Sequence, residues 1–95
     1  MVVGIGSLTL YIQECHSLKA KRKVVKALIA RLRNNFNASV AEVGANDMHQ
    51  KALIGFAVMG NDTQVINSKL DKMFNFVETL GLAEVLDSEL EIIHL

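Results

Sequence analysis

Cys15 and His16 are the residue pair that most suggests chemistry, because a thiol beside an imidazole can act as an activated nucleophile. Adjacent residues in an extended chain point in opposite directions, however, so they rarely form such a dyad. No third group that would orient the imidazole can be identified from the sequence. We therefore interpret Cys15 as an inert thiol and expect no catalytic residue.

Asp47 and His49 lie two residues apart and could act as metal ligands. A zinc site needs three or four protein ligands, and the other two histidines are too distant in sequence to be assigned to it. A polar loop without metal is the favoured interpretation, and no cofactor is expected. Gly4 and Gly6 resemble half of a dinucleotide fingerprint, but they lie at the start of a strand and the third glycine is missing.

A basic segment is the most uneven feature of the sequence. Residues 16–41 carry seven lysines and arginines and no acid, whereas the remainder carries three lysines and all ten acids. At about 100° per residue, most of these cations fall on one flank of a predicted helix, beside its apolar stripe. Such a stripe can follow the phosphates of a nucleic acid. The candidate nucleic-acid-binding residues are Lys19, Lys21, Arg22, Lys23, Lys26 and Arg33.

A simpler interpretation of the basic segment stays open. The formal net charge of the chain is zero, so the whole molecule has no general attraction toward nucleic acid or membrane. A run of charge is usually a solvated helix face. Asp87, Glu89 and Glu91 of the last predicted strand could neutralise it, either across the sheet edge or across a subunit interface.

Lys21 differs from the other cations because it falls close to the buried side of the helix. A lysine in that position either lays its aliphatic stem along apolar surface or meets an acid. Glu42 and Glu14 are the two candidate acids. A partly buried ion pair is the favoured interpretation.

The elements that position these side chains follow from hydrophobic periodicity. Residues 2–14 alternate from Ser7 onward, which predicts a strand with Leu8, Leu10 and Ile12 on its buried face. Residues 17–36 have apolar side chains at helical spacing, which predicts a helix capped by Ser17. Its end falls in the asparagine-rich residues 34–37, since asparagine tolerates the left-handed conformation common at helix ends.

The second half of the chain repeats this alternation of strands and helix. Residues 38–43 predict a short strand, and residues 44–51 a polar loop. Residues 53–59 are almost wholly apolar, which predicts a central strand covered on both faces. Residues 63–80 predict a second amphipathic helix that begins after Asn61 or Asp62 and ends at Gly81. Residues 85–95 predict the last strand.

This order predicts an α+β protein with a ferredoxin-like βαββαβ sandwich in one domain over residues 1–95. Right-handed crossovers place both helices on one face of a four-stranded antiparallel sheet. The other face would present Tyr11 with Ser7 and Thr9 of the first strand. The third strand would offer there either Phe56 or the set Gly55, Ala57 and Met59. The paired aromatic residues that stack RNA bases on related folds are absent. That open face suits pairing with another protein surface, most simply a second copy.

The compartment expected for this chain is the cytoplasm. A single cysteine excludes a disulfide framework within the chain, which fits a reducing environment. The first residues lack the basic start of a secretory signal, and the apolar stretches are too short to cross a bilayer. No membrane partner is expected.

Three ordered segments resemble the YlxP-like proteins, a small bacterial family catalogued as a domain of unknown function. They are Ser17–Arg22, Arg33–Val43, and Asp47 with Gln50. The resemblance implies a ferredoxin-like fold and no established activity. It also implies a ribosomal setting, because family genes often lie near genes for translation initiation and ribosome maturation. The sequence departs from the family at Cys15-His16, and at His49, where many members carry tryptophan.

These observations favour a non-enzymatic binding protein that contacts RNA through its basic first helix, and the family resemblance makes ribosomal RNA or a ribosomal subunit the expected partner. The alternative is a homo-oligomeric interaction module, such as a homodimer, that uses the open sheet face. A third hypothesis is an enzyme or small-ligand sensor that uses Cys15, His16 and Lys21 near the start of the helix.

Overall fold

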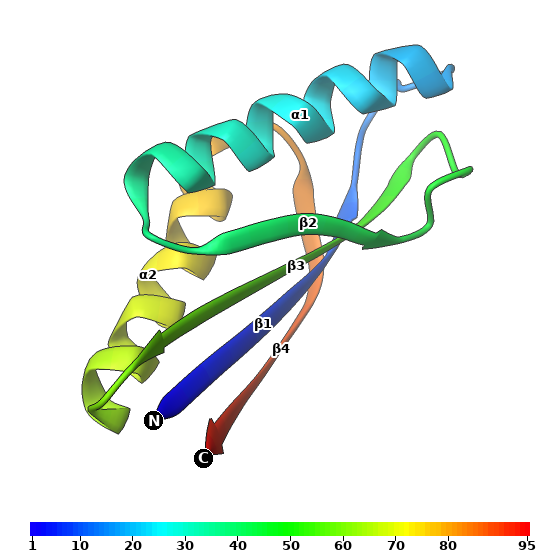
Figure 1. Ribbon diagram of the computed structural model, residues 1–95. Helices are drawn as coiled ribbons and strands as arrows, with labels where there is room; N and C mark the ends of the chain where they lie inside the picture. Colours follow the sequence, from blue (N-terminus) through cyan, green and yellow to red (C-terminus); the bar gives the residue numbers. More distant parts are fainter.

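The chain folds as four strands and two helices in the order β-α-β-β-α-β, and the computed structural model describes residues 1–95 (Figure 1). This confirms the ferredoxin-like α+β class predicted from the sequence. The elements are β1 (Val2–Tyr11), α1 (Leu18–Asn35), β2 (Ser39–Gly44), β3 (Lys51–Gly60), α2 (Thr63–Leu80) and β4 (Glu84–His94).

The strands form one antiparallel sheet in the order β2-β3-β1-β4, so β1 and β3 are central and β2 and β4 are the edges. Both helices lie on the same side of this sheet (Figure 1). The register of β1 with β4 shifts at Leu86, which has no partner and forms a bulge. A similar shift leaves Val43 of β2 unpaired.

The core lies between the helices and one face of the sheet. From the sheet, Leu8, Leu10 and Ile54 are almost completely buried, and Leu28 of α1 and Leu70 of α2 pack on them in one cluster. The alternation predicted for β1 is thereby confirmed. Because each apolar side chain withdrawn from water contributes about 1.5–3 kcal/mol, this layer dominates the stability of the fold.

The two glycines of β1 belong to this packing. A side chain on Gly6 would collide with the ring of Phe56, and one on Gly4 would collide with Ile66 of α2. Close packing of β1 against Phe56 of β3 and Ile66 of α2 therefore explains the two glycines that resemble half of a dinucleotide fingerprint.

The predicted helix ends are largely confirmed. The Ser17 side chain caps α1 by accepting a hydrogen bond from the Ala20 amide, and Asp62 caps α2 in the same way. Gly81 ends α2 in the left-handed conformation, with φ of 67°. The end of α1 differs from the prediction, because Phe36 follows the helix in an extended conformation and no asparagine there is left-handed.

Two other predictions need correction. The first strand ends at Tyr11 instead of Glu14, because the chain turns at Gln13 and Glu14, and Glu14 adopts a φ of 53°. The third strand is central as predicted, but it is covered on one face only. Its other face carries Leu53, Gly55 and Ala57, whose small or half-buried side chains face outward.

Candidate nucleic-acid interface

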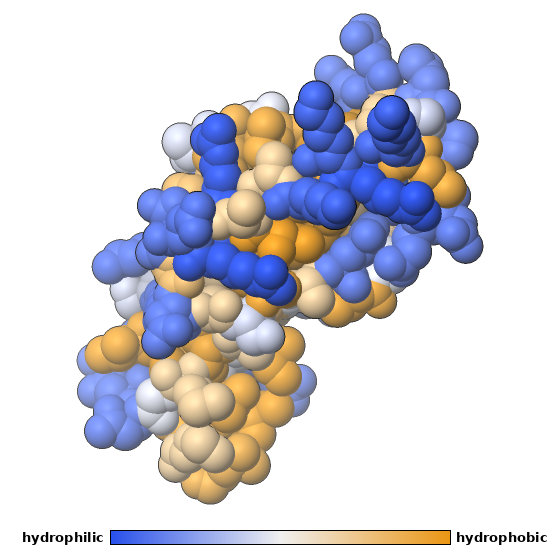
Figure 2. Space-filling model, turned by 45° about the horizontal axis from the view of Figure 1, so that its top comes forward, coloured by the Kyte–Doolittle hydropathy of each residue, from blue (hydrophilic) through white to orange (hydrophobic).

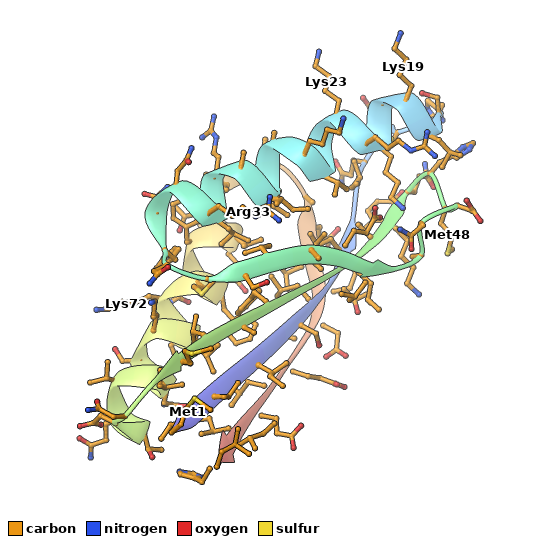
Figure 3. All side chains as sticks on the ribbon, viewed as in Figure 1. Met1, Lys19, Lys23, Arg33, Met48 and Lys72 are labelled. Atoms are coloured by element: carbon orange, nitrogen blue, oxygen red, sulfur yellow. The ribbon has the colours of Figure 1, made fainter.

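Six cations are exposed along α1, and five of them together form what we call the basic row. The helix itself follows from residues with high helix propensity and from the Ser17 cap. Figure 2 shows strongly hydrophilic side chains gathered on this side of the molecule, and Figure 3 shows Lys19 and Lys23 pointing away from the sheet. The members of the basic row are Lys19, Arg22, Lys23, Lys26 and Arg33.

The geometry of the basic row is that of a straight strip. At 3.6 residues per turn, its five members fall within an arc of about 100° around the helix axis. From Lys19 to Arg33 the strip is about 21 Å long at a rise of about 1.5 Å per residue. Arg31 is also exposed but lies roughly 80° or more around the helix from the nearest member, so it stands outside the row.

No carboxylate of the chain neutralises the basic row. The only ion pair in the structure joins Lys21 to Glu42. Asp87, Glu89 and Glu91 of β4 stand in register with residues on the open face of β1, on the side of the sheet that carries no helix. The predicted alternative, in which these acids pair with the basic helix across the sheet edge, is therefore wrong within one chain.

Arg33 has a structural contact in addition to its exposed position. Its guanidinium donates a hydrogen bond of 2.6 Å to the backbone carbonyl of Val40 in β2. This contact ties the last turn of α1 to the edge strand. Since a guanidinium carries five N–H donors, the remaining donors of Arg33 stay available for an external acceptor.

Lys21 is buried, with 1% of its side chain exposed, although the sequence placed it among the candidate phosphate contacts. Its Nζ lies 2.9 Å from Oε2 of Glu42 and also donates to the backbone carbonyl of Ala45. Oε2 of Glu42 accepts no aligned hydrogen bond, so the attraction between the two side chains is mainly electrostatic. Lys21 therefore leaves the set of surface cations, and of its two candidate acids Glu42 is the partner.

The contacts of Lys21 explain the segment Ser17–Arg22, one of the three that resemble the YlxP-like proteins. Ala45 adopts a left-handed conformation, with φ of 58°, at the point where the chain leaves β2. Lys21 thus joins α1, β2 and the start of the β2–β3 loop in one place. Within Ser17–Arg22, Ser17 begins the helix, Lys21 attaches it to the sheet, and Lys19 and Arg22 face solvent.

Lys69 and Lys72 of α2 extend the positive surface beyond α1. Lys69 donates a hydrogen bond of 3.1 Å to the carbonyl of Asn37, just after α1 ends. Both lysines, with Phe36, line a hollow of about 540 Å³ between the helices. They are not apparent from the sequence, where they fall within the acidic remainder of the chain. Their three-residue spacing on one flank of α2 was the available signal.

A second, larger hollow of about 730 Å³ lies at the other end of the molecule, and we call it the helix-end hollow. It is lined by the residues just before α1, by the β2–β3 loop and by the ends of β1 and β3. Cys15, His16, Asp47 and His49 all face this one space, although sequence spacing separated them into two pairs. Tyr11, the only tyrosine of the chain, lines it too.

The titratable side chains of the helix-end hollow make few contacts with one another. No three of its histidine, cysteine and acidic side chains come together as metal ligands. The buried Cys15 donates its thiol hydrogen to the carbonyl of Ser17 and makes no hydrogen bond with His16. His94 lies elsewhere, where its ring nitrogen is 2.9 Å from the Thr63 hydroxyl.

The open face of the sheet contrasts with the helix side. Three large apolar side chains are exposed on it, Ile5, Val43 and Met59, and the acids of β4 border them. Phe56 points into the core, so the outward set on β3 includes Gly55, Ala57 and Met59.

Neither helix combines the length and apolar character needed to cross a bilayer.

Solved structures share this arrangement at low sequence identity. The designed protein Foldit4 superimposes with a TM-score of 0.59 at 12% identity, over 98% of this chain and 96% of its own. The structural-genomics protein YJCS gives a TM-score of 0.53 at 14% identity, over 97% and 99% of the two chains. At these identities the likeness concerns the fold alone.

Sequence comparison is more specific. The uncharacterized protein YlxP of Bacillus subtilis strain 168 is 28% identical over 78 residues, which cover 82% of this chain and 85% of YlxP. The family described as protein of unknown function DUF503 matches residues 3–90, and this span includes both helices, all but the end of β4, and the helix-end hollow. The chain therefore belongs to the DUF503 family.

Proposed function

We propose that this protein is a non-enzymatic RNA-binding protein that contacts the phosphates of structured RNA through the basic row of α1. The observation that carries the proposal is that five exposed cations follow one strip of a helix and none has a carboxylate partner in the chain. Phosphate contacts by lysine and arginine release counterions, and this is the main source of affinity for nucleic acids.

The basic row also costs helix stability, which supports a binding role. Lys19 stands in the first turn, where a cation opposes the helix dipole by about 0.3–1 kcal/mol. Lys19 and Lys23, like Arg22 and Lys26, are four residues apart and repel each other by about 0.2–0.5 kcal/mol per pair. Exposed positions that violate a local stability rule are typical of functional surfaces.

Ribosomal RNA is the first ligand to test, because the family resemblance implies a setting among translation genes. The experiment is filter binding of ribosomal RNA fragments across a salt series. We expect the combined variant Lys19→Glu, Arg22→Glu and Lys26→Glu to lose at least about 100-fold in affinity at roughly 0.1 M salt, with the salt slope reduced by about 2 to 3.

Arg31→Glu provides a control for position, because it reverses one exposed charge on the same helix outside the basic row. Its affinity should fall by about threefold or less. Binding that is insensitive to salt, or that survives the triple reversal, would refute the proposal. Co-sedimentation with ribosomal subunits at low salt and release at high salt would support the ribosomal form of it.

A second candidate function is self-association through the open sheet face, favoured by the exposed side chains of Ile5, Val43 and Met59. A two-fold axis along the strands would place the acidic strand β4 of one copy against β2 of the other. The outward residues of β2 are Ser39, Ala41 and Val43, and none of them is charged. Such a pairing buries the apolar patch of both copies without opposing acids. Sedimentation as a monomer at high micromolar concentration would exclude it.

A further inference from the structure

We infer that the helix-end hollow receives the unpaired nucleobase of a looped RNA whose phosphates lie on the basic row. This rests on the proposed function, and it adds that the RNA must have an unstacked nucleotide. The hollow is larger than the one beside α2, and its volume of about 730 Å³ lies within the range of roughly 300–1,000 Å³ typical of small-molecule sites.

The lining of the hollow has the chemistry that recognises a base. Tyr11, His16 and His49 bring three flat rings to one space, and flat rings are what unpaired bases stack upon. The only tyrosine and two of the three histidines of the chain are thus gathered at one site. Asp47 and Gln50 add an acceptor and an amide, which are the groups that read the edges of a base.

The position of the hollow connects it with the basic row. Cys15 and His16, which line it, come directly before Ser17, the cap of α1, and Lys19 stands in the first turn. Figure 3 shows Lys19 on α1 and Met48 of the β2–β3 loop at the same end of the molecule. A strand whose phosphates follow α1 toward its start is therefore directed toward the end of the molecule at which the hollow lies.

Lys21 holds the two parts of this site together. It extends from α1 to the carbonyl of Ala45, where the β2–β3 loop begins, and so fixes the loop that carries Asp47 and His49 beside the start of the helix. A preformed hollow lowers the entropy lost when a base is bound.

The test compares a ribosomal RNA hairpin that has an unpaired loop with a fully paired duplex of the same stem. Because the chain has one tyrosine, protein labelled at the tyrosine ring gives a single set of ring signals in NMR spectra. A base stacked on Tyr11 shifts these signals upfield. We expect this shift with the hairpin and not with the duplex.

Binding of pocket variants completes the test. Tyr11→Leu and His49→Ala should each weaken hairpin binding by about 5- to 100-fold, since stacking on one ring is worth that factor, and should leave the duplex affinity and the salt slope unchanged. His49 is exposed on a loop, so His49→Ala leaves the fold intact, and His94→Ala is the matched histidine control outside the hollow.

The possible outcomes separate the two proposals. If RNA binds with the expected salt dependence but hairpin and duplex bind equally, or if both pocket variants bind the hairpin as the unaltered protein does, the nucleobase site is overturned and the phosphate-binding proposal stands. If neither RNA binds at low salt, both proposals fail.

Discussion

The two sides of the sheet carry opposite charge, although the chain as a whole is neutral. The helix side presents the basic row of α1 and the lysines of α2, whereas the open side presents an apolar patch bordered by Asp87, Glu89 and Glu91. The sheet lies between these surfaces, and no ion pair joins them. Net charge therefore says little about what such a protein attracts, and the arrangement of the charges across the fold decides it.

The largest effect on stability is expected when the helix that carries the basic row loses its attachment to the sheet at Lys21. Lys21→Met keeps an apolar stem but leaves Glu42 largely buried without its partner, which we expect to cost about 3 kcal/mol of unfolding free energy in urea denaturation. Lys23→Met, an exposed change on the same helix, should stay within about 0.5 kcal/mol.

A double variant shows whether the loss comes from the unpaired charge. Lys21→Met combined with Glu42→Leu replaces the ion pair with apolar side chains and should recover most of the stability. No recovery would mean that the hydrogen bond from Lys21 to Ala45, and not the ion pair, holds the helix to the sheet.

Lys72 tests whether the RNA interface extends from α1 onto α2. Lys72→Gln removes one exposed cation from the helix side, and we expect RNA affinity to fall about 5- to 8-fold at roughly 0.1 M salt, with a salt slope smaller by about 0.7 to 0.9. Filter binding across a salt series measures both quantities. An unchanged affinity and slope would confine the interface to α1.

Because the basic row destabilises its own helix, a substitution in it should change stability and RNA binding in opposite directions. Lys19→Glu places an acid in the first turn of α1, so the unfolding free energy should rise by about 0.5–1 kcal/mol. The same change should weaken RNA binding. Urea denaturation and filter binding on one preparation test the pair of effects, and a loss of stability would show that Lys19 makes a stabilising contact.

The smallest effect is expected on the open side. Asp87→Asn, Glu89→Gln and Glu91→Gln together neutralise three charged residues on the far face of the sheet. The triple variant on α1 also alters three charged residues, although it reverses their charge. RNA affinity should then rise by about threefold or less, because screening weakens charges more distant than roughly 10 Å. A rise as large as the loss caused by the α1 variant would mean that the two faces are not independent.

Much of the fold could be predicted from the sequence because its signals are local. Alternation in β1, helical spacing in α1 and α2, the caps at Ser17 and Asp62, and the glycine at position 81 each involve residues a few positions apart. The prediction failed where the backbone turned without a strong signal, as at Gln13 and Glu14. It also failed for β3, whose apolar sequence suggested cover on both faces although only one is covered.

The candidate site was predicted only in part. The exposed cations of α1 follow from helical periodicity, and the same periodicity placed Lys21 near the buried side without identifying its partner among two acids. Lys69 and Lys72 were missed because α1 and α2 are separated by two strands along the chain. Their approach to the end of α1 depends on the path of the sheet between them.

The sequence by itself determined the order of the elements, the segregation of charge along the chain and the acid-free surface of α1, because these depend on composition and on short repeats. Only the tertiary structure decided that Lys21 meets Glu42, that Tyr11, His16 and His49 share one hollow, and that the acids of β4 face away from the basic row. The reason is physical, since contacts between distant residues are set by strand order, register and loop path, which a chain fixes only when its core closes.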